Sequence, residues 1–309
     1  MTYTPDTLLT AMDRLGCPVT KRRLLDWTQK GLLPHPRPRG RGQGRGKVYQ
    51  WVEPDILHRA VDIYELLAWH RRAADLFLPL WVLGYDVPLT DVQTALRRFV
   101  DGLDAGLDAA VPRGGDRSDL VGDLLAAAQD RMPQQSAALP MPVLQAFLHA
   151  VVAPGAKEWE WLLDELEAVL VANSGGQAGW PDARGTAALA SFVRAQLSVP
   201  RLREVVATAG DAELVQVHRD LRQVVRAVRA VADVGLAIDP WLVTRVLVHL
   251  GTWGGIVDLA LRRAGHGPMV EHGVDQAADT CRRLLTDPRL RWELQQLRAQ
   301  SAGGSPGHA

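Results

Sequence analysis

Residues 20–51, TKRRLLDWTQKGLLPHPRPRGRGQGRGKVYQW, hold the pattern on which the predicted fold depends. Thr20 can cap a helix that runs through Lys30 and ends at Gly31. At about 100° per residue, the side chains of Leu24, Trp27 and Thr28 share one face of this helix. The opposite face is polar and mainly basic. We therefore expect the first face to pack against the protein and the second to face outward.

A basic stretch follows the helix. Between residues 34 and 47 the sequence carries five cations, no acidic residue and many glycines and prolines. The glycines and prolines exclude a helix, so the cations are expected on a loop or ribbon that can follow a phosphate backbone. Residues 48–51 resemble a short strand that closes the ribbon. The alternative is a disordered linker rich in arginine and glycine.

A second short helix precedes this segment. Residues 7–15 place Leu8, Met12 and Leu15 on one face, and Gly16 is expected to end the helix. Residues 17–19 form a tight turn, in which Cys17 is expected to be a small buried side chain. Two helices joined by such a turn, the second with a basic face, are typical of a helix-turn-helix that enters a DNA major groove.

Residues 18–67 resemble the DNA-binding domain of the MerR family of bacterial regulators. The matching pieces are Lys30-Gly31-Leu32-Leu33-Pro34, the basic wing, Lys47-Val48-Tyr49 and Glu53-Pro54-Asp55-Ile56-Leu57. Further on, residues 83–85 and 89–92 resemble parts of the next two family helices. The resemblance implies a winged helix-turn-helix and a bacterial transcription regulator. Where the family usually has arginine in the second helix, this chain has Leu25.

The resemblance and the charge pattern together predict which residues contact double-stranded DNA. They are Thr20, Lys21, Arg22, Arg23, Trp27, Gln29 and Lys30 of the second helix, with Arg37, Arg39, Arg41, Arg45, Lys47 and Tyr49 of the wing. Base contacts would come from Lys21, Arg22, Arg23 or Gln29. Similar small domains occur in excisionase-like recombination factors, so a recombination or excision accessory factor is the second hypothesis. A helical scaffold that binds an acidic protein is the third.

The rest of the chain is predicted to be helical, which gives a mainly α fold. The expected division is a winged helix-turn-helix over residues 1–72, helices and a connector over 73–111, an all-α domain over 118–300 and a disordered tail over 301–309. Residues 101–115 are connector-like by their glycines and small side chains. The all-α domain is expected to bind an effector, small molecule or protein, or another copy of the chain.

One pattern bears on dimerisation. Apolar residues spaced three and four apart follow a seam through Leu214, Val217, Leu221, Val224, Val228 and Val231. We favour packing within the chain over a coiled coil between two copies, because the seam lies far downstream of the DNA-binding segment. Whether the protein forms a homodimer stays open. Residues 241–250 are apolar almost all round, which predicts a central buried helix.

Composition narrows the class of protein. The net charge is zero, yet residues 1–72 carry a net +6 and the remainder a net −6, which suggests that the first part meets an anionic partner. No apolar run approaches a membrane span and no signal peptide is recognised, so a cytoplasmic protein without membrane contact is expected. Two cysteines give no disulfide framework or cysteine-rich zinc site. No catalytic motif, cofactor motif or metal site stands out, and we expect a protein that is not an enzyme.

Overall fold

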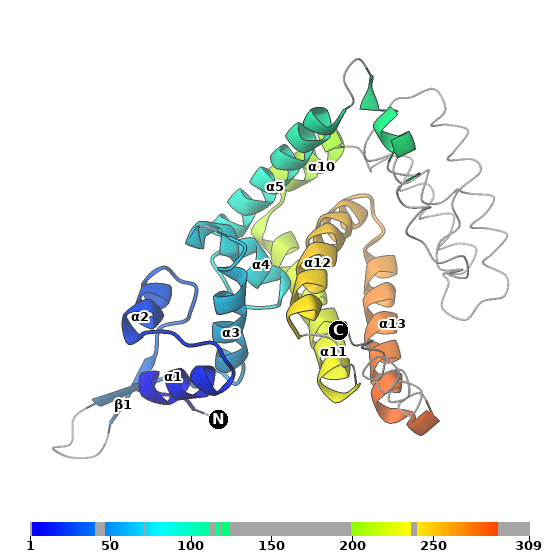
Figure 1. The fold of residues 1–309 in the computed structure, drawn as a ribbon. Helices are drawn as coiled ribbons and strands as arrows, with labels where there is room; N and C mark the ends of the chain where they lie inside the picture. Colours follow the sequence, from blue (N-terminus) through cyan, green and yellow to red (C-terminus); the bar gives the residue numbers. More distant parts are fainter. Residues whose placement is uncertain are drawn as a thin grey trace, which may run out of the picture. The chain divides into compact units, whose positions relative to one another are not determined.

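A computed structural model of the chain describes residues 2–40, 47–70, 72–111, 199–235 and 240–289, together with 115–117, 119–123 and 126. These residues are mainly helical, and a two-stranded antiparallel sheet follows the first two helices (Figure 1). The predicted mainly α class and the small two-stranded sheet are confirmed. Arg41 and Arg45, residues 127–198 of the predicted all-α domain and the predicted tail over 301–309 lie outside the described residues.

The second helix begins and ends at its predicted signals, and the first ends at its predicted glycine but begins at Pro5, two residues before the predicted start. Thr4 and Thr20 cap the first two helices, and each side chain accepts a hydrogen bond from a backbone N–H in the first turn. Gly16 and Gly31 follow them with φ of 76° and 73°, a left-handed conformation that costs glycine little. The elements are α1 (Pro5–Arg14), α2 (Lys21–Gln29), β1 (Arg37–Gly40), β2 (Lys47–Gln50) and α3 (Ile56–Leu66).

Helices make up the remaining described elements. They are the 3-10 helix η1 (Ala73–Leu76), α4 (Phe77–Val82), α5 (Leu89–Ala110), α10 (Val199–Thr208), α11 (Asp211–Gly235), α12 (Pro240–Arg263) and α13 (Gly267–Thr286).

The chain forms two compact units that are not continuous in sequence. The first joins Met1–Ala95 with Asp211–Gly255 and the segment from Gly273, and the second joins Leu96–Gly210 with Ile256–His272. This grouping differs from the linear division that the sequence predicts. The reason is that α11 packs on α4 and returns to the N-terminal elements, contacts that sequence periodicity does not specify.

The apolar seam of α11 packs inside the first unit. A Cβ atom at Gly255 of α12 would lie 3.3 Å from Leu221, 3.4 Å from Trp81 and 3.5 Å from Val217. Leu214 and Val217 are fully buried. The seam therefore contacts α4 and α12 of the same chain, as favoured from its position in the sequence.

Helix α12 differs from the buried helix that its composition predicts. Leu247 and Val248 join the core of the first unit, whereas Val246 is 46% exposed and Leu250 is 67% exposed. The prediction of a helix buried on all sides is wrong, because within the described residues only one side of this stretch is covered. The apolar composition of a helix limits how much apolar surface it can bury, and the elements packed against it determine how much of that surface is buried.

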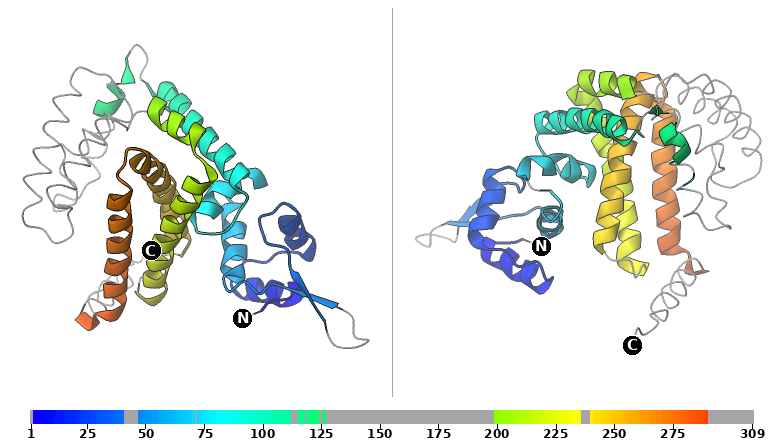
Figure 2. Two further views of the ribbon diagram at one scale, coloured as in Figure 1. Left: turned by 180° about the vertical axis from the view of Figure 1, so that it is seen from behind. Right: turned by 45° about the horizontal axis from the view of Figure 1, so that its top comes forward.

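In the second unit, α10 runs beside the later part of α5 (Figures 1 and 2). Arg97 donates to the carbonyl oxygen of Ala207 at 3.0 Å, and Arg203 pairs with Asp101 at 2.9 Å. Helix α5 continues through Gly102 to Ala110, so the predicted connector at 101–115 is wrong over most of its length. Glycine costs a helix about 1 kcal/mol per residue, and the contacts with α10 compensate for this cost.

Two glycines of α12 allow a controlled test of this packing. A Cβ atom at Gly251 would overlap Cγ1 of Val82, whereas one at Gly254 would meet nothing within 4 Å. We expect Gly251→Ala to lower the free energy of unfolding by about 1–3 kcal/mol through overpacking. Gly254→Ala should raise it by up to about 1 kcal/mol through helix propensity. Urea unfolding followed by circular dichroism measures both, and equal effects would contradict the close approach of α4 and α12.

Within the described part of the chain, no helix combines the length and the apolar character needed to span a membrane.

Candidate nucleic-acid interface

Helix α2 has one buried and one exposed face. Leu24, Trp27 and Thr28 are buried, and the Thr28 hydroxyl donates to the Leu24 carbonyl oxygen at 3.1 Å. The exposed side chains are those of Lys21, Arg22, Arg23, Leu25, Gln29 and Lys30. Leu25, at the position where the MerR family usually has arginine, is 49% exposed. The helix therefore presents a largely cationic surface with one apolar side chain in it.

Two of the predicted contact residues of α2 have structural roles. Trp27 is 2% exposed and belongs to the core, so its side chain is removed from the candidate surface. A buried aromatic ring cannot reach a partner without unfolding the helix that it anchors. Thr20 is exposed, and its hydroxyl oxygen accepts a hydrogen bond from the backbone N–H of Arg23 at 3.2 Å. It fixes the start of α2.

The β1–β2 hairpin carries cations on both of its faces. Arg37 pairs with Gln50 and Arg39 with Val48, so these four side chains share one face. Lys47 and Tyr49 lie on the other face and are exposed, Tyr49 by 54%. The hairpin extends away from α1, α2 and α3 (Figure 1). Both faces of the cationic hairpin are therefore accessible along much of its length.

The base of the hairpin is anchored through Trp51. This ring is 1% exposed, and its Nε1–H donates to the carbonyl oxygen of Pro34 at 2.6 Å. The backbone of Trp51 also exchanges two hydrogen bonds with Tyr3, at 3.0 and 2.8 Å. Trp27 and Trp51 belong to one buried cluster, so the structure attaches α2 and the hairpin to the same core.

Arg59 of α3 holds the segment after α2. Its Nε donates to the carbonyl oxygen of Leu32 at 2.6 Å and its Nη1 to that of Asp86 at 3.1 Å. Burial lowers the pKa of the guanidinium, and the nearby Tyr85 and carboxylates partly offset this shift. The hydrogen bonds to backbone carbonyls replace water around the charge. Arg59 is thus a positioning residue for the end of α2.

A buried polar network joins α3 to α11. Arg229 donates to Asp62 Oδ2 at 2.7 Å and to the Tyr85 hydroxyl at 2.9 Å, while that hydroxyl donates to Asp62 Oδ2 at 2.5 Å. Burial and the Asp62 carboxylate raise the pKa of Tyr85 well above its usual value. Burial opposes the charge of Arg229, but Asp62 and Tyr85 outweigh it and raise the guanidinium pKa.

The sequence prediction did not include Arg59 or Asp62. A signal was nevertheless available, because Arg59 lies between Ile63 and Leu66 on the helical wheel of α3, within its apolar stripe. A charged residue in such a stripe requires a buried partner. The partners themselves were not accessible from local sequence, since Arg59 bonds to carbonyl oxygens 27 residues away and Asp62 pairs with Arg229, 167 residues away.

The ion pairs on the α2 surface are exposed. Lys21 pairs with Asp6 at 3.1 Å and Lys30 with Asp26 at 2.7 Å, with every side chain at least 45% exposed. Such pairs contribute about 0–1 kcal/mol each. A polyanion could therefore replace either carboxylate at little cost.

Comparison of the chain with protein-family models, with curated proteins and with solved structures gives no significant match.

Proposed function

We propose that the protein binds a specific site on double-stranded DNA and regulates transcription, as MerR-type regulators do. In this proposal α2 enters the major groove, and the β1–β2 hairpin follows the phosphate backbone or an adjacent minor groove. Base contacts come from Lys21, Arg22, Arg23 or Gln29.

The observation that carries the proposal is the exposure of seven cations on two elements fixed to one core. They are Lys21, Arg22, Arg23, Lys30, Arg37, Arg39 and Lys47. Between residues 20 and 52 the sequence has a single acidic residue, Asp26. A rigid helix supplies geometry for base contacts, while a cationic hairpin supplies affinity that does not depend on sequence. This combination supports DNA over an acidic protein, which offers no groove to the helix.

Salt dependence tests the electrostatic part of the proposal. The full chain is titrated with a duplex selected from a randomised pool and with a scrambled duplex of equal length. If about six cations contact phosphates, affinity should fall by about three decades between 50 and 200 mM salt. Arg37→Ala/Arg39→Ala should weaken both duplexes alike and reduce the slope of log K against log salt by about 2.

Helix variants test sequence readout. Arg22→Ala/Arg23→Ala should reduce the ratio of affinities for selected and scrambled duplexes by about tenfold or more. Arg98→Ala/Arg219→Ala, which removes two exposed arginines from α5 and α11, is the control with the same charge change. The proposal fails if wild type does not bind duplex DNA at low salt, or if the control pair weakens binding as much as the hairpin pair.

A further inference from the structure

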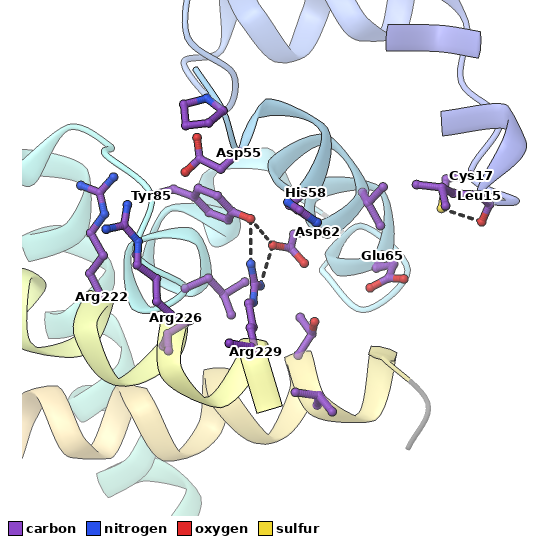
Figure 3. Close-up of a pocket in the computed structure, with 18 residues that line it drawn as sticks. Leu15, Cys17, Asp55, His58, Asp62, Glu65, Tyr85, Arg222, Arg226 and Arg229 are labelled. Carbon is purple, nitrogen blue, oxygen red and sulfur yellow. Dashed lines mark hydrogen bonds and ion pairs between the residues drawn. The ribbon is translucent and has the colours of Figure 1, made fainter. Parts of the chain in front are cut away.

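A cavity of about 800 Å³ lies inside the first unit, where α3 faces α11 and α12 (Figure 3). Its size is within the range of sites that enclose small organic ligands, about 300–1,000 Å³. None of its lining residues belongs to the exposed cationic surface of α2 and the hairpin. It is a separate feature that the proposed DNA binding does not use.

Much of the cavity wall is apolar. Val61 of α3, Leu83 after α4, Val225 and Ala230 of α11 and Val243 of α12 all line it. Such a surface favours the hydrocarbon part of a ligand. The wall therefore selects against a bare inorganic ion.

Three arginines of α11 give the cavity its charged side. Arg222, Arg226 and Arg229 extend from α11 toward α3 (Figure 3). Arg229 is neutralised by Asp62 at 2.7 Å. The other two are poorly compensated: Arg222 Nη1 is 3.7 Å from Asp86, an 81% exposed carboxylate, and Arg226 has no ion pair among the described residues.

One donor of Arg222 is not satisfied within the described part of the chain. Its Nε is buried and has no hydrogen-bond partner within the described ranges. This atom is shielded from the cavity, but the Arg222 side chain as a whole is 33% exposed, so the N–H groups at its end are accessible to a ligand. Such a guanidinium end matches the oxygens of a carboxylate or phosphate. Gly84 leaves room for this side chain, because a Cβ atom there would lie 3.0 Å from Cγ of Arg222 and 3.3 Å from its Cα.

The carboxylates of the cavity do not cancel this charge. Asp55 and Glu65 line it together with Asp62. Asp62 is occupied by Arg229, the charge of Asp55 acts on Arg59, and Glu65 lies near Cys17, away from Arg222 and Arg226 (Figure 3). An anionic group at Arg222 and Arg226 is therefore favoured, with the rest of the ligand along the apolar wall.

We propose that this cavity binds a small organic carboxylate with an apolar body, whose carboxylate pairs with Arg222 and Arg226 of α11. The occupant is a monoanion of aromatic or branched aliphatic character, and its ring or chain lies against Val61, Val225 and Val243.

The test uses the full chain without DNA, so its outcome does not depend on the proposed function. Benzoate, 2-naphthoate and 4-methylpentanoate are titrated by calorimetry, each beside its uncharged primary amide. If each non-hydrogen atom contributes the binding free energy that is usual for drug-sized ligands, 2-naphthoate should bind with a Kd of about 1 mM or tighter. Each carboxylate that binds should do so about tenfold or more tightly than its amide.

Two variants locate the site. Arg222→Gln/Arg226→Gln should weaken carboxylate binding about tenfold or more, while Arg219→Gln, on the same helix but not lining the cavity, should leave it unchanged. Ala230→Phe keeps every charge and fills the cavity, so it should also abolish binding. Circular dichroism checks that each variant is folded. Absence of binding by all three carboxylates, equal binding of the amides, or unchanged binding by Ala230→Phe would overturn the proposal.

Discussion

Trp51→Ala is expected to lower the free energy of unfolding by about 3–5 kcal/mol, the cost of removing a large aromatic side chain from a packed core. The ring is 1% exposed and belongs to the buried cluster that also contains Trp27. Its loss leaves a cavity that the surrounding helices cannot fill, and the carbonyl oxygen of Pro34 loses its donor. Urea unfolding followed by circular dichroism measures the change.

Two companion variants grade the contribution of this position. Trp51→Phe removes the Nε1–H donor and three ring atoms but keeps an aromatic ring in the core, so a loss of about 1–3 kcal/mol, smaller than that of Trp51→Ala, is expected. Tyr49→Ala, two residues earlier and 54% exposed, should change stability by less than about 0.5 kcal/mol. If Tyr49→Ala costs as much as Trp51→Ala, the anchoring role of Trp51 is wrong.

Arg229→Met is expected to lower the free energy of unfolding by about 3 kcal/mol, because it leaves the Asp62 carboxylate buried without its cation. The Asp62 side chain is 8% exposed and that of Arg229 is 25% exposed, so water can replace only part of the lost interaction. Thermal and urea unfolding of the full chain measure the loss. Arg226→Met, one turn earlier on α11, is the matched control and should cost less than about 0.5 kcal/mol.

We expect that the ion pair between Asp62 and Arg229 adds little to the free energy of unfolding compared with apolar side chains in the same space. Asp62→Leu/Tyr85→Phe/Arg229→Met removes the whole polar network and fills its space with apolar atoms. Replacing a buried ion pair in this way is often neutral or stabilising, so the triple variant should recover most of the stability that Arg229→Met loses. A triple variant as unstable as the single one would show that the geometry of the network, and not the uncompensated carboxylate, carries the effect.

Local sequence was sufficient for the elements near the N-terminus. Thr20 as a cap, Gly31 as the end of α2 and the inward face of Leu24 and Trp27 all follow from short-range rules and are present in the structure. The same rules overestimated the tendency of Gly102 to end a helix, because contacts between α5 and α10 keep α5 continuous there.

The candidate surface was predicted in part. The exposure of Arg22, Arg23, Arg37 and Arg39 agrees with the prediction, whereas Trp27 is buried. Family resemblance and helical periodicity gave different roles to Trp27, and periodicity was correct. An aromatic side chain on the apolar face of a short helix contributes more by packing than it could by contact with a partner.

Sequence alone determined the mainly α class, the basic helix and hairpin, and the ends of the first helices, because caps, turns and periodicity act over a few residues. Only the tertiary structure decided that Asp62 of α3 pairs with Arg229 of α11, that the α11 seam packs within its own chain, and that a cavity lies between these helices. These features depend on residues far apart in the chain. The local sequence pattern shows that a charged or apolar side chain on a buried helix face needs a partner. The packing of the whole unit decides which residue that partner is.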